Sequence, residues 1–342
     1  MADTAPPPAV RQDLVPLLEA PSKIELTPPD ISAYRRGNVG IDYVTRFEAA
    51  RPGPTVVING LTHGNEPCGA HAVDFLFRMG FQPTRGRLVL CLANVAAYHT
   101  FDPARPLASR FMDEDFNRLW TGEALDGAGD TVELRRARQL RPVFEDADIV
   151  LDLHSMQQAA PPLILCGRTD RGRGLAHLVG FPALVVADTG HLSGRRLIDF
   201  SPFSDPAGHR AAILVECGQH WRADAADVAI GVTLTLLTRL GMADPDLVAA
   251  HLPRPMATGQ TFIEVTEAIT AADDDFTFAA DFIGQEVIPR AGTLIGRDGR
   301  REVRTPYDNC ILIMPSRHPH RGQTAVRLGR IVADFSPGYL TA

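Results

Sequence analysis

Short apolar runs alternate with longer amphipathic stretches over residues 40–230. The runs are rich in valine, isoleucine and leucine, as in TVVING at 55–60, and most are apolar at nearly every position. Such runs, separated by stretches of helical period, are typical of a mostly parallel sheet covered by helices on both faces, so we predict an α/β fold. The predicted strands are 41–49, 55–60, 87–95, 148–155, 162–167, 183–188 and 211–218, and the predicted helices are 69–79, 130–144, 171–178 and 223–240.

The pattern changes after a stretch rich in proline and aspartate at 244–255. Beyond it, short strands separated by glycine and Asp-Gly turns predict a small antiparallel β domain. The chain has 342 residues, more than one core usually holds. We therefore predict an N-terminal arm at 1–35, an α/β domain at 36–250 and a β-rich domain at 256–342. The predicted strands of the last domain are 260–270, 275–280, 286–296, 301–306, 310–316 and 330–335.

Composition narrows the class of protein. The formal net charge of −7 argues against nucleic acid as the main partner. Five scattered cysteines without a CxxC pair indicate a reduced, cytoplasmic setting. The proline-rich start lacks the apolar core of a signal peptide, and the longest helical apolar stretch, from Val228, is shorter than the roughly 20 residues that span a bilayer. We expect a soluble cytoplasmic protein with no membrane partner.

Polar residues of metal-binding type stand at the ends of two apolar runs. His63 and Glu66 follow the predicted strand 55–60, and His154 ends the predicted strand 148–155. Because the carboxyl ends of parallel strands meet at one edge of a sheet, we expect these side chains to lie together. Two histidines and a carboxylate, with a fourth position open, form a known ligand set for catalytic zinc. Asp152 is either a hydrogen-bond partner for a ligand histidine or a residue that caps the strand.

A third strand end and one loop add candidate catalytic groups. Glu216 ends the predicted strand 211–218, where a carboxylate is costly to bury without a purpose, and it could act as general base on a metal-activated water. The segment SRFMDEDFNRLW at 109–120 gathers Arg110, Asp115, Asn117 and Arg118. An arginine can grip a carboxylate with two hydrogen bonds, and Arg110 could instead polarise a carbonyl and stabilise an oxyanion.

Taken in order, HGNE, the DxNR segment, DLH and the ECG glutamate resemble the succinylglutamate desuccinylase/aspartoacylase family. That family is the amidohydrolase branch of the zinc carboxypeptidase-like fold. The resemblance covers residues 50–240, and the β-rich tail matches the family's second domain. It implies hydrolysis of a small N-acyl amino acid to a carboxylic acid and a free amine.

The resemblance also implies a role for each matching residue. One zinc ion per chain would be held by His63, Glu66 and His154, and Glu216 would activate the water. Arg110 would polarise the amide carbonyl. Asn117 and Arg118 would bind the substrate carboxylate. Asp115 would orient the arginine segment. The family also admits a homodimer, although no stretch of this sequence indicates an interface.

Several departures leave the substrate open. Relatives that act on acidic amino acids carry an arginine ten residues before the catalytic glutamate, where this chain has Pro206. His220 is a candidate to enter the pocket, and Tyr307 or Tyr339 is a candidate to close it. Three alternatives remain: a zinc carboxypeptidase-type peptidase, an ester as the scissile bond, and a catalytically silent zinc-binding protein. No GxSxG elbow or GxGxxG motif supports serine or dinucleotide chemistry.

Overall fold

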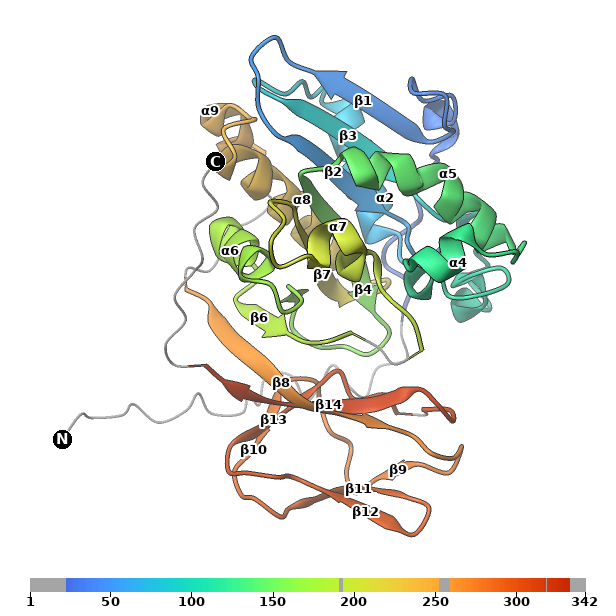
Figure 1. The fold of residues 1–342 in the computed structure, drawn as a ribbon, viewed down its shortest axis with the longest axis vertical. Coiled ribbons are helices and arrows are strands. Elements are labelled where there is room, and N and C mark those ends of the chain that lie inside the picture. Colours follow the sequence, from blue (N-terminus) through green and yellow to red (C-terminus); the bar gives the residue numbers. More distant parts are fainter. Residues whose placement is uncertain (1–22, 191–192, 252–258, 318, 333–342) are drawn as a thin grey trace, which may run out of the picture. The chain divides into compact units, whose positions relative to one another are not determined.

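The apolar runs predicted as strands within residues 40–230 pair into one sheet in the computed structural model of the chain (Figure 1). The structure describes residues 23–190, 193–251, 259–317 and 319–332. These residues fall into two units. The larger unit comprises Ile24–Gln157, Pro162–Glu264 and residues 331–332, and the smaller unit is made mainly of Val265–Arg330 with Gln158–Pro161.

Strand pairing in the larger unit is mostly parallel. The strand order is β1-β3-β2-β4-β7-β5-β6-β8. β2 pairs in parallel with β3 and β4, β4 pairs with β7, and β6 pairs with β5 and β8, whereas β1 and β5 run antiparallel to β3 and β7. The predicted mixed, mostly parallel sheet is confirmed. Its strands are β1 (Val44–Glu48), β2 (Thr55–Gly60), β3 (Arg87–Leu92), β4 (Ile149–Met156), β5 (Leu163–Leu165), β6 (Leu184–Ala187), β7 (Ala211–Gln219) and β8 (Thr261–Thr270), which continues into the smaller unit.

All four predicted helices form, with ends shifted by one or two residues. α2, α6 and α8 share one apolar core against the sheet, and Figure 1 shows α5 on the opposite face. On that opposite face the buried Trp120 ring lies among the rings of Phe116, Phe144 and Phe200. Threonine side chains cap the first turns of α5 and α6. The helices are α2 (Cys68–Arg78), α5 (Val132–Asp146), α6 (Asp170–Val179) and α8 (Ala223–Arg239).

One-turn helices are the elements that the sequence pattern missed. The predicted strand 87–95 ends at Leu92, because the Asn94 side chain accepts a hydrogen bond from the Ala97 N–H and starts a helix instead. Such helices are too short to show a helical period. They are α3 (Val95–Tyr98), α4 (Gly122–Asp126), α7 (Ser201–Ser204) and α9 (Pro245–Ala249), with 3₁₀ turns η2 (Ser32–Tyr34), η3 (Pro106–Ser109), η4 (Phe116–Arg118) and η5 (Leu197–Asp199).

The smaller unit is an antiparallel β structure, as predicted. β13 pairs with β10 and β14, and β11 pairs with β9 and β12. An Asp-Gly turn links β11 to β12, with Gly299 at a φ of 58° that glycine adopts easily. The predicted strand 286–296 is two strands, and the strand predicted at 330–335 is the end of β14; residues 333–335 lie outside the described residues. The strands are β9 (Thr277–Phe278), β10 (Glu286–Ile288), β11 (Leu294–Asp298), β12 (Arg301–Arg304), β13 (Cys310–Ile313) and β14 (Thr324–Ile331).

Two further expectations concern the chain as a whole. The predicted linker at 244–255 contains α9, and residues 252–258 lie outside the described residues, so the predicted domain boundaries stay predictions. The described end of the predicted N-terminal arm packs into the larger unit, where Leu26 and Ile31 are buried. Across the described ranges, no helix combines the length and the apolar character needed to cross a bilayer.

Candidate metal centre and active site

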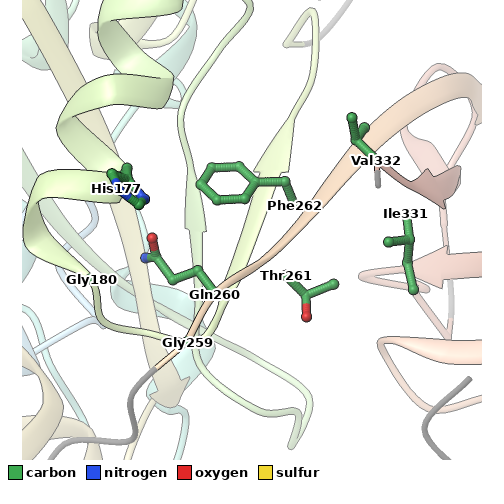
Figure 2. Close-up of a pocket in the computed structure, with 8 residues that line it drawn as sticks. All are labelled: His177, Gly180, Gly259, Gln260, Thr261, Phe262, Ile331 and Val332. Atoms are coloured by element: carbon green, nitrogen blue, oxygen red, sulfur yellow. The ribbon is translucent and has the colours of Figure 1, made fainter. Parts of the chain in front are cut away.

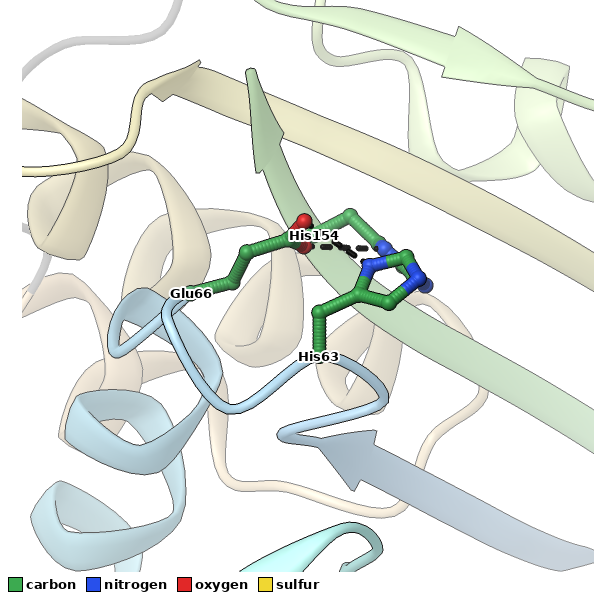
Figure 3. A group of neighbouring side chains, drawn as sticks. All are labelled: His63, Glu66 and His154. Atoms are coloured by element: carbon green, nitrogen blue, oxygen red, sulfur yellow. Dashed lines mark hydrogen bonds and ion pairs between the residues drawn. The ribbon is translucent and has the colours of Figure 1, made fainter. Parts of the chain in front are cut away.

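Three neighbouring parallel strands bring the predicted residues to one edge of the sheet. His63 and Glu66 lie in the loop after β2, His154 lies near the end of β4, and Glu216 lies in β7 directly opposite His154 in the strand register. This convergence is what the sequence predicts. Figure 3 shows the side chains of His63 and Glu66 meeting that of His154 at the end of β4.

The loop after β2 packs closely against neighbouring backbone at Gly64. A Cβ atom on Gly64 would lie 2.4 Å from the Ser109 carbonyl oxygen and 2.4 Å from the Tyr98 nitrogen. Those atoms belong to backbone, so a side chain at position 64 would force the loop to move. The absence of a side chain in the glycine of HGNE therefore allows the loop path that places His63 and Glu66.

His63, Glu66 and His154, which we call the ligand cluster, are almost fully buried and share hydrogen bonds. His63 Nδ1 lies 2.8 Å from Glu66 Oε1, and His154 Nδ1 lies 2.9 Å from Glu66 Oε2. One ligand atom of each residue lies within 4.8 Å of the others. The three side chains are between 2% and 4% exposed. This donor set fits a single metal ion, because two imidazole nitrogens and a carboxylate are the ligands that zinc takes with one position left open.

The second nitrogen of each histidine points at a carboxylate. His63 Nε2 lies 2.9 Å from Asp115 Oδ1, and His154 Nε2 lies 2.9 Å from Asp152 Oδ2. Hydrogen bonds of this kind fix the ring and leave the other nitrogen to face a metal. The structure thus places Asp152 against His154 rather than at a strand cap. Asp115, which was expected to orient the arginine segment, also contacts a histidine of the ligand cluster.

Neighbouring charges shift the pKa values of Glu66 and His154. Burial alone would raise the pKa of Glu66, but the adjacent His63 and His154 hold it well below its usual range. Burial likewise disfavours protonated His154, yet the Asp152 and Glu66 carboxylates raise its pKa well above the ordinary value. The carboxylates of Glu66 and Asp152 therefore favour a positive charge between them, which a bound cation would also supply.

Glu216 differs from every other carboxylate at this edge. Its side chain is 6% exposed, and its Oε2 atom has no hydrogen-bond partner among the described residues. Burial raises the pKa of Glu216 to about 8, although nearby His154 opposes that shift. A buried carboxyl group with one oxygen unpartnered among the described residues and a pKa of about 8 is suited to taking and returning a proton.

Residues 110–118, which we call the arginine loop, flank the cluster from outside the sheet. Arg110 donates from NH1 to Glu66 Oε1 at 3.2 Å and from NH2 to Asp115 Oδ2 at 3.1 Å, and its side chain is 35% exposed. The Arg118 side chain is 21% exposed and donates to the Asn117 carbonyl oxygen at 2.7 Å. Both guanidinium groups are thus near the cluster and partly accessible.

Asn117 is engaged more deeply than the predicted carboxylate grip requires. It is buried, and its Oδ1 accepts the Leu197 N–H at 2.8 Å. The Asp115 side chain accepts the Asn117 N–H at 2.9 Å and so begins the turn η4. Asn117 therefore also ties the arginine loop to the segment around residue 197.

Comparison with known proteins matches the same part of the chain. The family model of the succinylglutamate desuccinylase/aspartoacylase catalytic domain matches residues 52–238. The chain belongs to this family. A succinylglutamate desuccinylase of Vibrio campbellii is 25% identical over 311 residues, covering 86% of this chain and 85% of that protein.

Other members of the family give more distant or shorter matches. A probable aspartoacylase of Parasynechococcus marenigrum is 33% identical over 128 residues, covering 35% of this chain and 40% of that protein. The crystal structure of succinylglutamate desuccinylase from Vibrio cholerae superposes with a TM-score of 0.63 at 20% identity, covering 85% of this chain and 86% of that one. The structural match confirms the predicted fold.

Two buried contacts beside the ligand cluster were not predicted from the sequence. The Ser155 N–H donates to Glu66 Oε2 at 3.2 Å, and Ser155 Oγ lies 2.9 Å from His220 Nδ1. His220 is 2% exposed, and burial lowers its pKa to about 4, so the ring is neutral. His220 thus contacts Ser155 beside the ligand cluster, a contact that no local motif reveals because the two residues are 65 positions apart.

A second missed feature is a buried arginine after β6. Arg196 donates to both carboxylate oxygens of Asp188, at 2.6 and 3.1 Å, and to Asp199 at 2.7 Å. It is 1% exposed. Its charge is therefore already balanced by two aspartates.

Two tyrosines are predicted to close the pocket, and both assignments stay predictions. Tyr307 lies in the smaller unit, where its hydroxyl lies 2.6 Å from Thr266 Oγ1, and Tyr339 lies outside the described residues. A cavity of about 430 Å³ opens elsewhere in the larger unit, and Figure 2 shows that none of the predicted site residues lines it. Its lining residues are His177, Gly180, Gly259, Gln260, Thr261, Phe262, Ile331 and Val332.

Proposed function

We propose that this chain is a zinc-dependent hydrolase that removes the acyl group from a small N-acyl amino acid. One observation carries the proposal: the buried Glu216 carboxylate, with an oxygen that has no partner among the described residues, lies opposite His154 at the edge that holds the ligand cluster. A ligand cluster alone fits a structural metal. A free carboxylate beside it fits hydrolysis, which needs a group to accept and return a proton.

The metal would be held by His63 Nδ1, His154 Nδ1 and a Glu66 oxygen, the atoms that face one another in the structure. Bound there, zinc would supply Lewis acidity, which makes a water more acidic and a carbonyl more electrophilic. Asp115 and Asp152 would hold the two imidazole rings in the ligand orientation through their second nitrogens.

The chain's own residues supply the other parts of the reaction. Glu216 would take a proton from the attacking water and deliver it to the leaving amine nitrogen. Arg110 is near enough to the cluster to donate to the developing oxyanion. Arg118, with Asn117 beside it, would bind the substrate carboxylate, for which a planar guanidinium offers two parallel hydrogen bonds.

The names of the relatives support the substrate class. They describe a succinylglutamate desuccinylase and a probable aspartoacylase, both of which cleave an acyl group from an amino acid. Pro206 stands where relatives that act on acidic amino acids carry an arginine. We propose that the amine product is an amino acid whose side chain is not acidic.

The test is a substrate panel. The zinc-loaded full-length protein is incubated with N-acetyl, N-formyl and N-succinyl amino acids of acidic and neutral type, with C-terminal dipeptides beside them, and free amine is measured. Chelator-sensitive release from one group of N-acyl amino acids is the expected result. Dipeptide cleavage would assign a carboxypeptidase activity instead, and silence with one zinc bound per chain would favour a non-catalytic zinc protein.

A further inference from the structure

A fully buried glutamate lies at the start of α5, apart from the ligand cluster. Glu133 is 0% exposed, and no cationic side chain is among its hydrogen-bond partners within the described part of the chain. Burial of a carboxylate without a cation is costly, so its oxygens need several donors. The sequence offers no hint of this role, because TVELRR reads as the first turn of an ordinary amphipathic helix.

The donors are backbone amides of the arginine loop. Glu133 Oε1 accepts the Met112 N–H at 2.7 Å, and Oε2 accepts the N–H groups of Asp113 at 3.0 Å and Glu114 at 3.3 Å. Asn94 Nδ2 donates to Oε1 at 3.0 Å. Three successive amides that converge on one carboxylate form an anion-binding nest, here filled by a side chain of the same protein.

A second set of hydrogen bonds joins the same two segments. Asp113 Oδ2 accepts the Val132 N–H at 2.7 Å, and the Thr131 hydroxyl bonds to the Glu114 carboxylate. The loop and the start of α5 are therefore tied in both directions. The fully buried Glu133 carboxylate lies at the centre of this arrangement.

Residues assigned to substrate lie on both sides of the three bound amides. Arg110 precedes Met112 by two positions, and Asn117 and Arg118 follow Glu114 within four. None of the ligand cluster lies on this loop. We propose that Glu133 is a positioning residue, which fixes the arginine loop so that Arg110 and Arg118 meet the substrate; this proposal rests on the proposed function.

A carboxylate suits this position for a chemical reason. It has only acceptors, and all three amides are donors. In Glu133→Gln one oxygen becomes an NH₂ group that faces backbone N–H groups, so at least one of these hydrogen bonds is lost while the side chain keeps its shape. Glu145→Gln is the matched control, because Glu145 lies on the same helix and pairs with Arg141 at the surface.

The first measurement is hydrogen exchange at the amides of residues 112–114, which does not depend on activity. We expect exchange on the order of tenfold faster or more in Glu133→Gln than in the wild type, with no change in Glu145→Gln. Unchanged exchange in Glu133→Gln would overturn the proposal. If the wild type releases no amine from any substrate, the proposed function fails, and this measurement still decides whether Glu133 holds the loop.

The second measurement separates positioning from general stability. A displacement of the loop by about 1 Å would lower kcat/KM on the order of 100-fold, with zinc content unchanged. In a background that carries both Arg110→Ala and Arg118→Ala, Glu133→Gln should cost much less, because both groups that it positions are gone. An equal loss in both backgrounds would show a role in folding only and would overturn the proposal. If Glu133→Gln does not fold, Glu133→Asp is measured in the same two backgrounds, because it keeps the charge but has a shorter side chain.

Discussion

The ligand cluster and the arginine loop serve one site, but different structures hold them. The ligand cluster lies at the ends of parallel strands in the middle of the sheet, is at most 4% exposed, and is fixed by side-chain hydrogen bonds to Asp115 and Asp152. The arginine loop lies outside the sheet and carries Arg110 at 35% and Arg118 at 21% exposure. The strand ends thus fix most of the proposed metal site, with Asp115 of the arginine loop against one histidine ring, whereas a few hydrogen bonds fix the proposed substrate contacts.

This difference has a consequence for how each part tolerates change. A shift in the cluster would disturb neighbouring strands of the core, so its geometry is coupled to the stability of the fold. The loop can move without unfolding the sheet, and its outer side chains Phe111 and Met112 are exposed. We therefore expect substitutions in the cluster to abolish metal binding and substitutions in the loop to change substrate affinity.

The largest effect should come from the cluster itself. His154→Ala removes one of the three ligands, so bound zinc and amine release should both fall to background, as they should for the chelated wild type. His71→Ala is the control, since that histidine lies on α2 and bonds to the Thr27 carbonyl oxygen instead. Metal analysis and turnover are measured on the same samples. A fully zinc-loaded and active His154→Ala protein would refute the ligand assignment.

Next in size is the loss of the proton-transfer group. Glu216→Gln keeps the shape of the side chain but cannot accept a proton, so kcat should fall about 1,000-fold while zinc content stays at one per chain. Stopped assays of amine release, with metal analysis alongside, check both values. Wild-type turnover in this variant would remove the central support for a hydrolase.

A smaller effect should follow from changing the loop. Arg118→Ala should raise KM between about 10-fold and 100-fold, because a charged hydrogen bond to the substrate carboxylate is lost. Arg118→Lys should recover only part of this loss, since an ammonium lacks the planar fork. Neither change should alter zinc binding. Equal effects on a substrate that lacks the carboxylate would show that Arg118 acts elsewhere.

The smallest effect concerns pH and the buried His220. Burial lowers its pKa in the folded state to about 4, below the ordinary value of about 6.5, so acid favours the unfolded chain as pH falls from 6.5 towards 4. His220→Gln keeps an acceptor for Ser155 and removes this titration. Thermal unfolding of the metal-free proteins from pH 7 to 4 should show a shallower loss in the variant, by up to about 3 kcal/mol. Parallel curves would indicate that His220 has the same pKa in the folded and unfolded states and would contradict this prediction.

The cluster could be predicted from the sequence because strand ends leave a local signal. Three of the apolar runs end on a histidine or glutamate or are followed closely by one, and parallel strands bring such ends together. Neither periodicity nor motif spacing could show that Asn117 bonds to Leu197, or that Ser155 bonds to His220, because these pairs are distant in sequence and joined only by the fold. The one-turn helices were missed for the opposite reason, since they are local but too short for a period.

Residues with two tasks were predicted only in part. Asp115 was expected to orient arginines, and it does contact Arg110, but it also bonds to His63 and caps a turn. Glu133 was not singled out at all, because a carboxylate bound by backbone amides has no sequence signature. The sequence therefore predicts the chemistry at the strand ends better than the hydrogen bonds that hold the loops around them.

All five cysteines are buried, and this makes the protein convenient for labelling. A thiol reagent should leave the folded chain almost unmodified, so a single cysteine introduced at an exposed position would carry a probe at one defined place. Met112 is 45% exposed and lies on the arginine loop beside an amide bound by Glu133. A fluorophore or spin label on Met112→Cys would therefore report the mobility of that loop directly, with and without substrate, in the otherwise intact protein.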